Sequence, residues 1–415
     1  MLSTWALRNF RLALWHCAIA LTLTSCSAEL QNSVVRNYFM LASANNSRNE
    51  VTEVYIYEID HTNGNLRAPK VFNAGDTITA LASNPFRNEF YVFKKNSTKF
   101  YVSVYRYDPE TTLAKEIYSI ETGFEVENAT VNESGTLLYV SNKPPTAPNP
   151  RQTASDGIQI FDIRQDGKVQ LSSAIAIANY STDSVTRVGT MSVFPQINRI
   201  VSTLGSLSPY FVDHLIENEG RSLKFLYESG KFPYASTGTT FGAAPIPNTS
   251  FLAMTFTLVT PAGQQLIKLL KLEPTEGKAP WVFATNTLSY CAAAKDLRIY
   301  SKARAIYMRS GSGDELCTAN YSIGGSDSAE VSGVVQHFSK LYIGNATTTT
   351  NIQGMNALAV AGDLPYLYAS TESNLHVFKI STSRNGYLTY LNGFGGISST
   401  QDLVPFLVYK KAPKS

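Results

Sequence analysis

A short apolar segment returns at nearly regular intervals along almost the whole sequence. Its seven copies occupy residues 39–42, 90–93, 138–141, 200–203, 252–255, 306–309 and 367–370, so that neighbouring copies begin 48 to 62 residues apart. A period of this length indicates a repeat array, in which each unit buries its apolar face against the next unit. We therefore expect the repeated part of the chain to fold as one unit, although 415 residues could hold two or three ordinary domains.

Each unit shows the same order of expected strands. A strand of small residues precedes the apolar segment, as at residues 77–82, 128–131, 188–193, 237–243 and 355–361. An alternating strand follows, as in Val-Tyr-Ile-Tyr-Glu-Ile-Asp at residues 54–60, and a ragged outer strand comes last. The dipeptides at 63–64, 166–167 and 385–386 read Asn-Gly, Asp-Gly and Asn-Gly, which favours tight hairpins between the third and fourth strands.

Four strands per unit, with the smallest side chains innermost, are typical of a β-propeller blade. We therefore predict an all-β fold, a seven-bladed β-propeller with four-stranded antiparallel blades. The first unit lacks a small-residue strand, while an apolar stretch at residues 401–409 follows the last unit. If this C-terminal strand pairs into the first blade, it closes the ring and leaves no open sheet edge at the seam.

The N-terminus has the pattern of an export signal. Arg8 and Arg11 precede an apolar run at residues 12–23, and Leu-Thr-Ser leads to Cys26. This ending resembles the lipobox of bacterial lipoproteins, which implies cleavage before Cys26 and attachment of lipid such as palmitate. A transmembrane helix is an alternative, but the run is shorter than the roughly 20 residues needed; an ordinary secretory cut near Ala28 is another.

The resulting division of the chain is a signal peptide at 1–25, a lipidated N-terminus and tether at 26–36, and the propeller at 37–415. Ser27 follows Cys26 without an Asp, which resembles the outer-membrane sorting pattern. The sequence therefore predicts an exported protein that is anchored in the bacterial cell envelope by lipid, with the outer membrane favoured.

Two cysteines lie in the propeller region, Cys291 and Cys317. In an exported protein such a pair favours one disulfide. Two buried, reduced thiols are the alternative. No Cys-x-x-Cys occurs, so neither redox catalysis nor a cysteine zinc site has support.

Several function classes lack support in the sequence. The net charge is +3 and no basic run is present, so nucleic acid is not expected as a partner. His61, His214, His337 and His376 have no metal-ligand spacing, and no hydrolase or nucleotide-binding motif occurs. We expect neither a metal nor a cofactor.

Two sequence patterns resemble a known group of propellers. Residues 132–136 (Asn-Glu-Ser-Gly-Thr) precede a Leu-Tyr-Val-Ser strand, and an alternating strand precedes Asn-Gly-Asn-Leu at residues 63–66. Together they resemble the lactonase-type seven-bladed propellers, which include the 6-phosphogluconolactonase-like and YVTN-repeat proteins. The resemblance implies the fold and, by analogy, sugar-lactone hydrolysis. Family enzymes usually show His-Pro corners, which this chain lacks, so no catalytic residue can be transferred from the family.

Candidate binding residues lie in loops on the face formed by connections between blades and between second and third strands. The Pro-rich stretch at 142–157 is the longest of these loops, and it could equally be a passive insertion. The aromatic and charged residues of these loops are of types that dominate interfaces. The candidates are Arg151, Asp156, Tyr180, Asp183, Arg187, Tyr234 and Tyr290.

We weigh three functions on this basis. The leading hypothesis is a lipid-anchored, non-catalytic platform for another envelope protein, a glycan or a small ligand. The alternative is a sugar-lactone hydrolase, and a third possibility is a scaffold in outer-membrane protein assembly. Converging carboxylates, His or Arg over the central channel would favour the enzyme, whereas Ser, Thr and Ala with exposed aromatics would favour binding. The mostly small residues of the inner strands favour binding.

Overall fold

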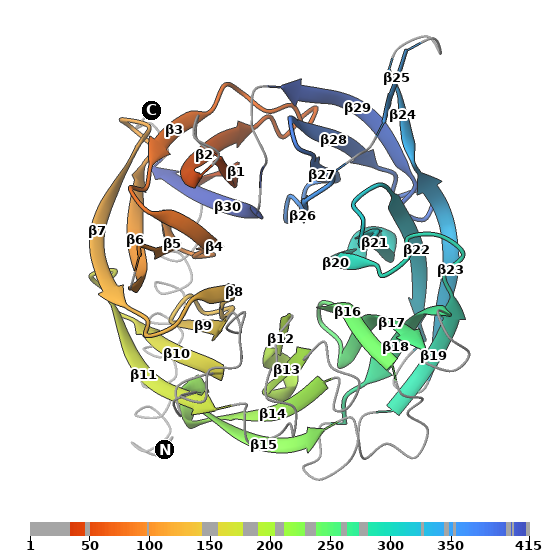
Figure 1. Cartoon of the computed structure of the whole chain (residues 1–415), viewed down its shortest axis with the longest axis horizontal. Helices are drawn as coiled ribbons and strands as arrows, with labels where there is room; N and C mark the ends of the chain where they lie inside the picture. Colours follow the sequence, from red (N-terminus) through yellow and green to blue (C-terminus); the bar gives the residue numbers. More distant parts are fainter. Residues whose placement is uncertain are drawn as a thin grey trace, which may run out of the picture.

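The computed structural model describes residues 34–45, 50–97, 99–142, 157–176, 190–203, 211–228, 238–258, 264–273, 281–324, 328–343, 348–351, 354–395, 400 and 402–411. Seven four-stranded antiparallel sheets stand in a ring (Figure 1). This arrangement confirms the predicted seven-bladed β-propeller. Among the described residues, no helix has the length and hydropathy needed to cross a bilayer.

Within each blade, the strands follow one another from the axis of the ring outward. Blade 1 contains β30 (Asp402–Lys411), β1 (Val34–Asn45), β2 (Val51–Ile59) and β3 (Lys70–Asn73). Blade 2 contains β4 (Thr77–Ser83), β5 (Glu89–Lys95), β6 (Phe100–Asp108) and β7 (Leu113–Glu121). Blade 3 contains β8 (Val126–Val131), β9 (Leu137–Asn142), β10 (Gly157–Ile163) and β11 (Val169–Ala176). Blade 4 contains β12 (Met191–Phe194), β13 (Arg199–Thr203), β14 (Phe211–Glu217) and β15 (Ser222–Glu228).

The remaining blades follow the same order. Blade 5 contains β16 (Gly238–Pro245), β17 (Phe251–Leu258), β18 (Gln265–Lys271) and β19 (Trp281–Thr287). Blade 6 contains β20 (Lys295–Tyr300), β21 (Ala305–Arg309), β22 (Leu316–Ile323) and β23 (Ala329–Phe338). Blade 7 contains β26 (Ala357–Val360), β27 (Tyr366–Ser370), β28 (Asn374–Ile380) and β29 (Leu388–Gly395). A separate hairpin, β24 (Lys340–Ile343) with β25 (Thr348–Asn351), lies between the last two blades in sequence.

The C-terminal strand closes the ring as the sequence predicts. Strand β30 pairs antiparallel with β1 along ten residues of each strand, with Phe39 opposite Phe406. It thereby becomes the innermost strand of blade 1, beside β4 of blade 2 (Figure 1). Because the two ends of the repeat array share one sheet, the seam is fastened by backbone hydrogen bonds and leaves no free edge.

The hydrophobic core consists of separate clusters of buried side chains, several of which lie between neighbouring blades. Between blades 1 and 2, for example, Phe39 of β1, Phe90 of β5 and Phe406 of β30 form one aromatic group. The ring centroids of Phe90 and Phe406 are 5.6 Å apart. The apolar second strands found in the sequence supply much of this buried surface, which explains why they recur once in each blade.

The turn glycines and the second-strand tyrosines meet across blade boundaries. A tyrosine hydroxyl in one blade donates a hydrogen bond to the carbonyl of the glycine in the β-hairpin turn of the next blade. The three pairs are Tyr139 with Gly220 (3.2 Å), Tyr307 with Gly386 (2.8 Å) and Tyr368 with Gly64 (2.8 Å). Two sequence features that look local therefore form one repeated contact between blades.

Candidate functional site

The inner strands of the seven blades converge around the axis of the ring (Figure 1). Each of them pairs with a neighbouring strand on one side only, so its other edge carries backbone groups outside the sheet ladder. Two charged side chains supply partners for such groups. They are Asp402 of β30 and Arg298 of β20, and they carry the candidate site.

Asp402 bridges from blade 1 to blade 2. Its Oδ2 accepts a hydrogen bond from the backbone N–H of Leu81 in the middle of β4, at 3.0 Å. Burial raises the pKa of Asp402 to about 6, and the nearby carboxylate of Asp296 adds to the increase, while the Leu81 N–H and Arg298 oppose it. A carboxyl group with this pKa can exchange a proton near neutral pH.

Arg298 bridges from blade 6 to blade 7. Its Nε donates to the carbonyl of Leu358 in β26 at 2.7 Å, and its Nη1 donates to the carbonyl of Leu297 at 3.1 Å. These bonds fix the orientation of the guanidinium plane. Nη2 makes no hydrogen bond with the described part of the chain, which leaves a positively charged donor available to a ligand.

A β-bulge places the third charged group of the site. Between Lys295, which faces Arg309, and Arg298, which faces Tyr307, two residues of β20 oppose one residue of β21. Asp296 lies in this bulge with φ +50°, and its Oδ2 accepts from Arg309 Nε at 2.5 Å. Bulges of this kind redirect side chains next to functional sites. Here the bulge brings Asp296 close enough to Asp402 and Arg298 to influence the same titration.

We call Asp296, Arg298, Arg309 and Asp402 the axial cluster. The sequence analysis did not single out any of its members. The available signal was the inner strand at residues 295–300, which reads Lys-Asp-Leu-Arg-Ile-Tyr where five other units have small residues. Among the described residues, no group of three or more His, Cys, Asp or Glu side chains is arranged to hold a metal ion.

Most binding residues proposed from the sequence fall outside the described part of the structure. These are Arg151, Asp156, Tyr180, Asp183, Arg187 and Tyr234, and the lipidation candidate Cys26 falls outside it as well. For these residues the predictions stand as made.

Tyr290 is the exception, and it belongs to a group on blade 6 that is separate from the axial cluster. Its exposed ring stacks on His337 of the outermost strand β23, with ring centroids 4.2 Å apart. His337 Nε2 lies 3.0 Å from Glu315 Oε1, and Glu315 Oε2 accepts from the backbone N–H of Cys291 at 2.7 Å. The predicted disulfide between Cys291 and Cys317 is present, which confirms the pairing over two reduced thiols.

Two other histidines, His214 and His376, are buried. Burial lowers the pKa of His214 and that of His376 to about 4, so both are neutral at neutral pH. His376 lies 3.4 Å from the Thr371 hydroxyl and 3.5 Å from the Tyr390 hydroxyl. Its surroundings are those of a packed side chain in a blade.

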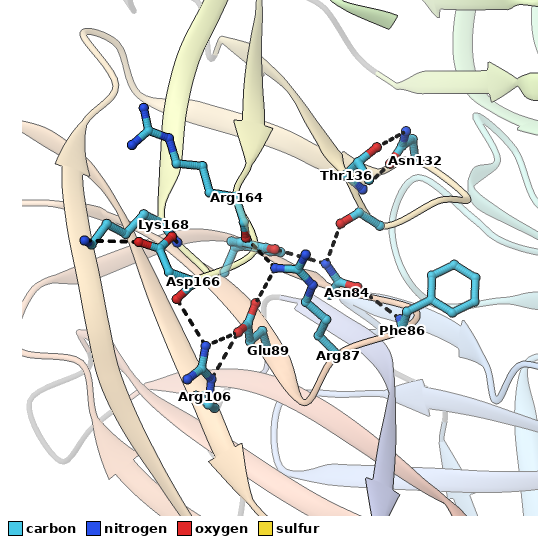
Figure 2. Close-up of polar contacts among 12 residues, drawn as sticks. Asn84, Phe86, Arg87, Glu89, Arg106, Asn132, Thr136, Arg164, Asp166 and Lys168 are labelled. Atoms are coloured by element: carbon cyan, nitrogen blue, oxygen red, sulfur yellow. Dashed lines mark hydrogen bonds and ion pairs between the residues drawn. The ribbon is translucent and has the colours of Figure 1, made fainter. Parts of the chain in front are cut away.

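A second polar cluster lies between blades 2 and 3, and its contacts are structural (Figure 2). Glu89, 3% exposed, accepts from Arg106 Nη2 at 2.6 Å, and the same nitrogen donates to the carbonyl of Asp166 at 3.2 Å. Arg87 donates to the carbonyl of Arg164 at 2.5 Å. Arg87 of the β4–β5 turn and Arg106 of β6 both donate to backbone carbonyls of the β10–β11 turn, so this cluster fastens one blade to the next.

Comparisons with known proteins agree with the seven-bladed propeller fold. The family model described as "Lactonase, 7-bladed beta-propeller" matches residues 40–187. No curated protein matches the sequence. The structure is similar to that of the periplasmic gluconolactonase of Pseudomonas aeruginosa, with 15% identity and a TM-score of 0.63, covering 91% of this chain and 100% of that one.

It is also similar to a putative 6-phosphogluconolactonase of Bacteroides uniformis, with 14% identity and a TM-score of 0.65, covering 88% of this chain and 98% of that one. Identities this low show the fold alone. The chain therefore has the fold of the lactonase-type seven-bladed β-propellers, which confirms the resemblance found in the sequence.

Proposed function

We propose that the protein hydrolyses a sugar lactone at the axis of its propeller. The observation that carries this proposal is the axial cluster, in which carboxylates and guanidinium groups from blades 1 and 6 act on one another. Converging carboxylates and Arg side chains at the central channel were expected for an enzyme, so this cluster favours an enzyme over a passive binding platform. The fold shared with a periplasmic gluconolactonase adds support.

The chemistry assigned to the cluster is general-base hydrolysis. Asp402 takes a proton from a water molecule, whose oxygen attacks the lactone carbonyl carbon. Arg298 stabilises the negative charge that forms on the carbonyl oxygen. The ring C–O bond then breaks, its oxygen takes the proton back from Asp402, and the product is the open hydroxy acid. Burial keeps the pKa of Asp402 above its ordinary value, and the negative charge of Asp296, which Arg309 holds in place, adds to this increase.

The non-catalytic platform is the competing hypothesis. It draws on the small residues of several inner strands and on the exposed Tyr290 ring. A platform for an envelope protein, a glycan or a small ligand, or a scaffold in outer-membrane protein assembly, needs no carboxyl group that titrates near neutral pH. Activity measurements separate these hypotheses from the enzyme.

The test is turnover of a panel of sugar and acyl lactones by the full-length chain, with and without divalent cations. Asp402→Asn and Arg298→Gln are the test variants. Asp363→Asn is the matched control, because Asp363 is an exposed carboxylate in the β26–β27 turn. We expect losses of roughly 100-fold or more in the test variants, typical of removing a general base or an oxyanion donor, and none in the control. Absence of turnover by folded protein would return attention to the platform.

We also propose that lipid at Cys26 anchors the protein in the bacterial cell envelope, with the outer membrane favoured. The support is the sequence pattern of residues 8–26. Labelling of bacterial cells with a fatty-acid analogue tests it. Label should enter the wild-type chain and not Cys26→Ser; equal labelling of both would overturn the proposal.

A further inference from the structure

A cavity of about 330 Å³ lies between blades 6 and 7, away from the axial cluster. Its walls come from the end of β22, the start of β23, the β20–β21 turn and the β28–β29 turn of blade 7. The polar residues that line it are Arg304, Asn320, Ser322, Glu330, Ser332 and Asn385. Its volume falls at the lower end of the range for ligand pockets, about 300–1,000 Å³.

The cavity adjoins an irregular part of the outer ladder of blade 6. The pairing of β22 with β23 shifts register at Thr318/Ala319 and again between Ala319 and Tyr321. At the break, the Ser332 hydroxyl accepts from the backbone N–H of Asn320 at 2.7 Å and donates to the carbonyl of Gly333 at 2.8 Å. At this break a side chain replaces the ladder contact of Asn320, and the pairing resumes at Tyr321 opposite Val331.

Three polar side chains around this opening, those of Arg304, Asn320 and Glu330, keep hydrogen-bonding groups that no described residue satisfies. Asn320 Oδ1 is buried and has no hydrogen-bond partner within the described part of the chain. Over the same residues, neither Arg304 nor Glu330 takes part in an ion pair. A buried acceptor without a donor costs free energy unless a ligand or water supplies one. The site therefore has unused hydrogen-bonding capacity of both kinds.

The charge and shape of the lining identify the ligand class. The guanidinium of Arg304 and the carboxylate of Glu330 cancel in net charge, so neither an anion nor a cation is favoured. The amides of Asn320 and Asn385 mix donors with acceptors, while Val331, 7% exposed, contributes apolar surface. Sugar hydroxyl groups donate and accept at once and suit such a surface. We propose that this cavity binds a neutral saccharide of one or two rings.

The experiment is ligand-observed NMR and calorimetry on the full-length chain with glucose, galactose, N-acetylglucosamine and maltose. Glycine, a zwitterion, and inorganic phosphate, an anion, serve as comparison ligands. Glu330→Gln and Asn320→Ala are the test variants, and both should fold because neither side chain has a stabilising partner among the described residues. Glu219→Gln is the control, since Glu219 is likewise an exposed carboxylate and lies in the β14–β15 turn of blade 4, outside the cavity lining.

We expect at least one neutral sugar to bind, with roughly tenfold weaker affinity in each test variant, the effect of losing one hydrogen bond to the ligand. Binding should be unchanged in Glu219→Gln and in Asp402→Asn. The second of these separates the cavity from the axial cluster, so either proposal can fail without the other. Absence of sugar binding by folded protein, binding that survives both test variants, or preference for glycine or phosphate would each overturn the proposal.

Discussion

The glycine in the β28–β29 turn provides a quantitative test of how neighbouring blades are held together. Gly386 has φ +79°, and a Cβ placed there would lie 2.2 Å from Ala305 Cβ in blade 6. Gly75 has φ +88°, but a Cβ there would meet no atom within 4 Å. Alanine at either position has the same left-handed backbone cost, about 1–2 kcal/mol. Only at Gly386 does it also overpack a blade contact, which typically costs a further ~1–3 kcal/mol.

Gly386→Ala should therefore lower the free energy of unfolding by about 2–5 kcal/mol, and Gly75→Ala by about 1–2 kcal/mol. Urea unfolding followed by tryptophan fluorescence measures both, and unfolding midpoints serve if the transition is not two-state. The difference between the variants isolates the blade contact from the backbone term. Equal losses would refute the inference that the turn glycines are needed for packing between blades.

Three further predictions concern stability. Arg199→Met should cost about 3–5 kcal/mol near pH 8, because Arg199 and Asp213 form a 2.7 Å ion pair with both side chains 1% exposed. The loss should be smaller at pH 5, where Asp213, whose pKa burial raises to about 7, is protonated. Reduction of the Cys291–Cys317 disulfide, 26 residues apart in sequence, should lower stability by about 3 kcal/mol, measured by urea unfolding with and without reductant. Asp402→Asn should raise stability by about 1–3 kcal/mol above pH 7. The pKa of Asp402 is raised on folding, so the folded state binds the extra proton and loses stability as pH rises from about 4 to about 6. Thermal unfolding at pH 4 and pH 8 should show the gain only at pH 8.

The fold could be predicted because each blade repeats the same local requirements. The apolar segments at 39–42 and 90–93 lie in β1 and β5, the second strands of their blades, as expected. Ring closure could be predicted because the first unit lacks an inner strand and an additional strand at residues 401–409 follows the last unit. Strand bounds were less accurate: residues 128–131 were expected as an inner strand, whereas β8 is Val126–Val131. The β24–β25 hairpin was not anticipated, since it lies outside the repeat.

The axial cluster could not be predicted in the same way. Asp402 reaches Arg298 and Asp296 only because β30 closes the ring, which brings together residues more than a hundred positions apart. The sequence analysis described the inner strands by their average composition, and that average concealed the charged residues of β20 and Asp402 of β30. Such a site has to be sought in the units whose inner strands carry charged residues instead of small ones.

The pH dependence of lactone hydrolysis by the full-length chain tests the central claim most directly. Asp402 must be ionised to accept a proton from water, so kcat/KM should rise through an apparent pKa of about 6 and level off above it. The same profile measured on Asp363→Asn should be unchanged, and Asp402→Asn should lose the activity. A rate that is flat across pH 6, or that survives in Asp402→Asn, would contradict the assignment of catalysis to the propeller axis.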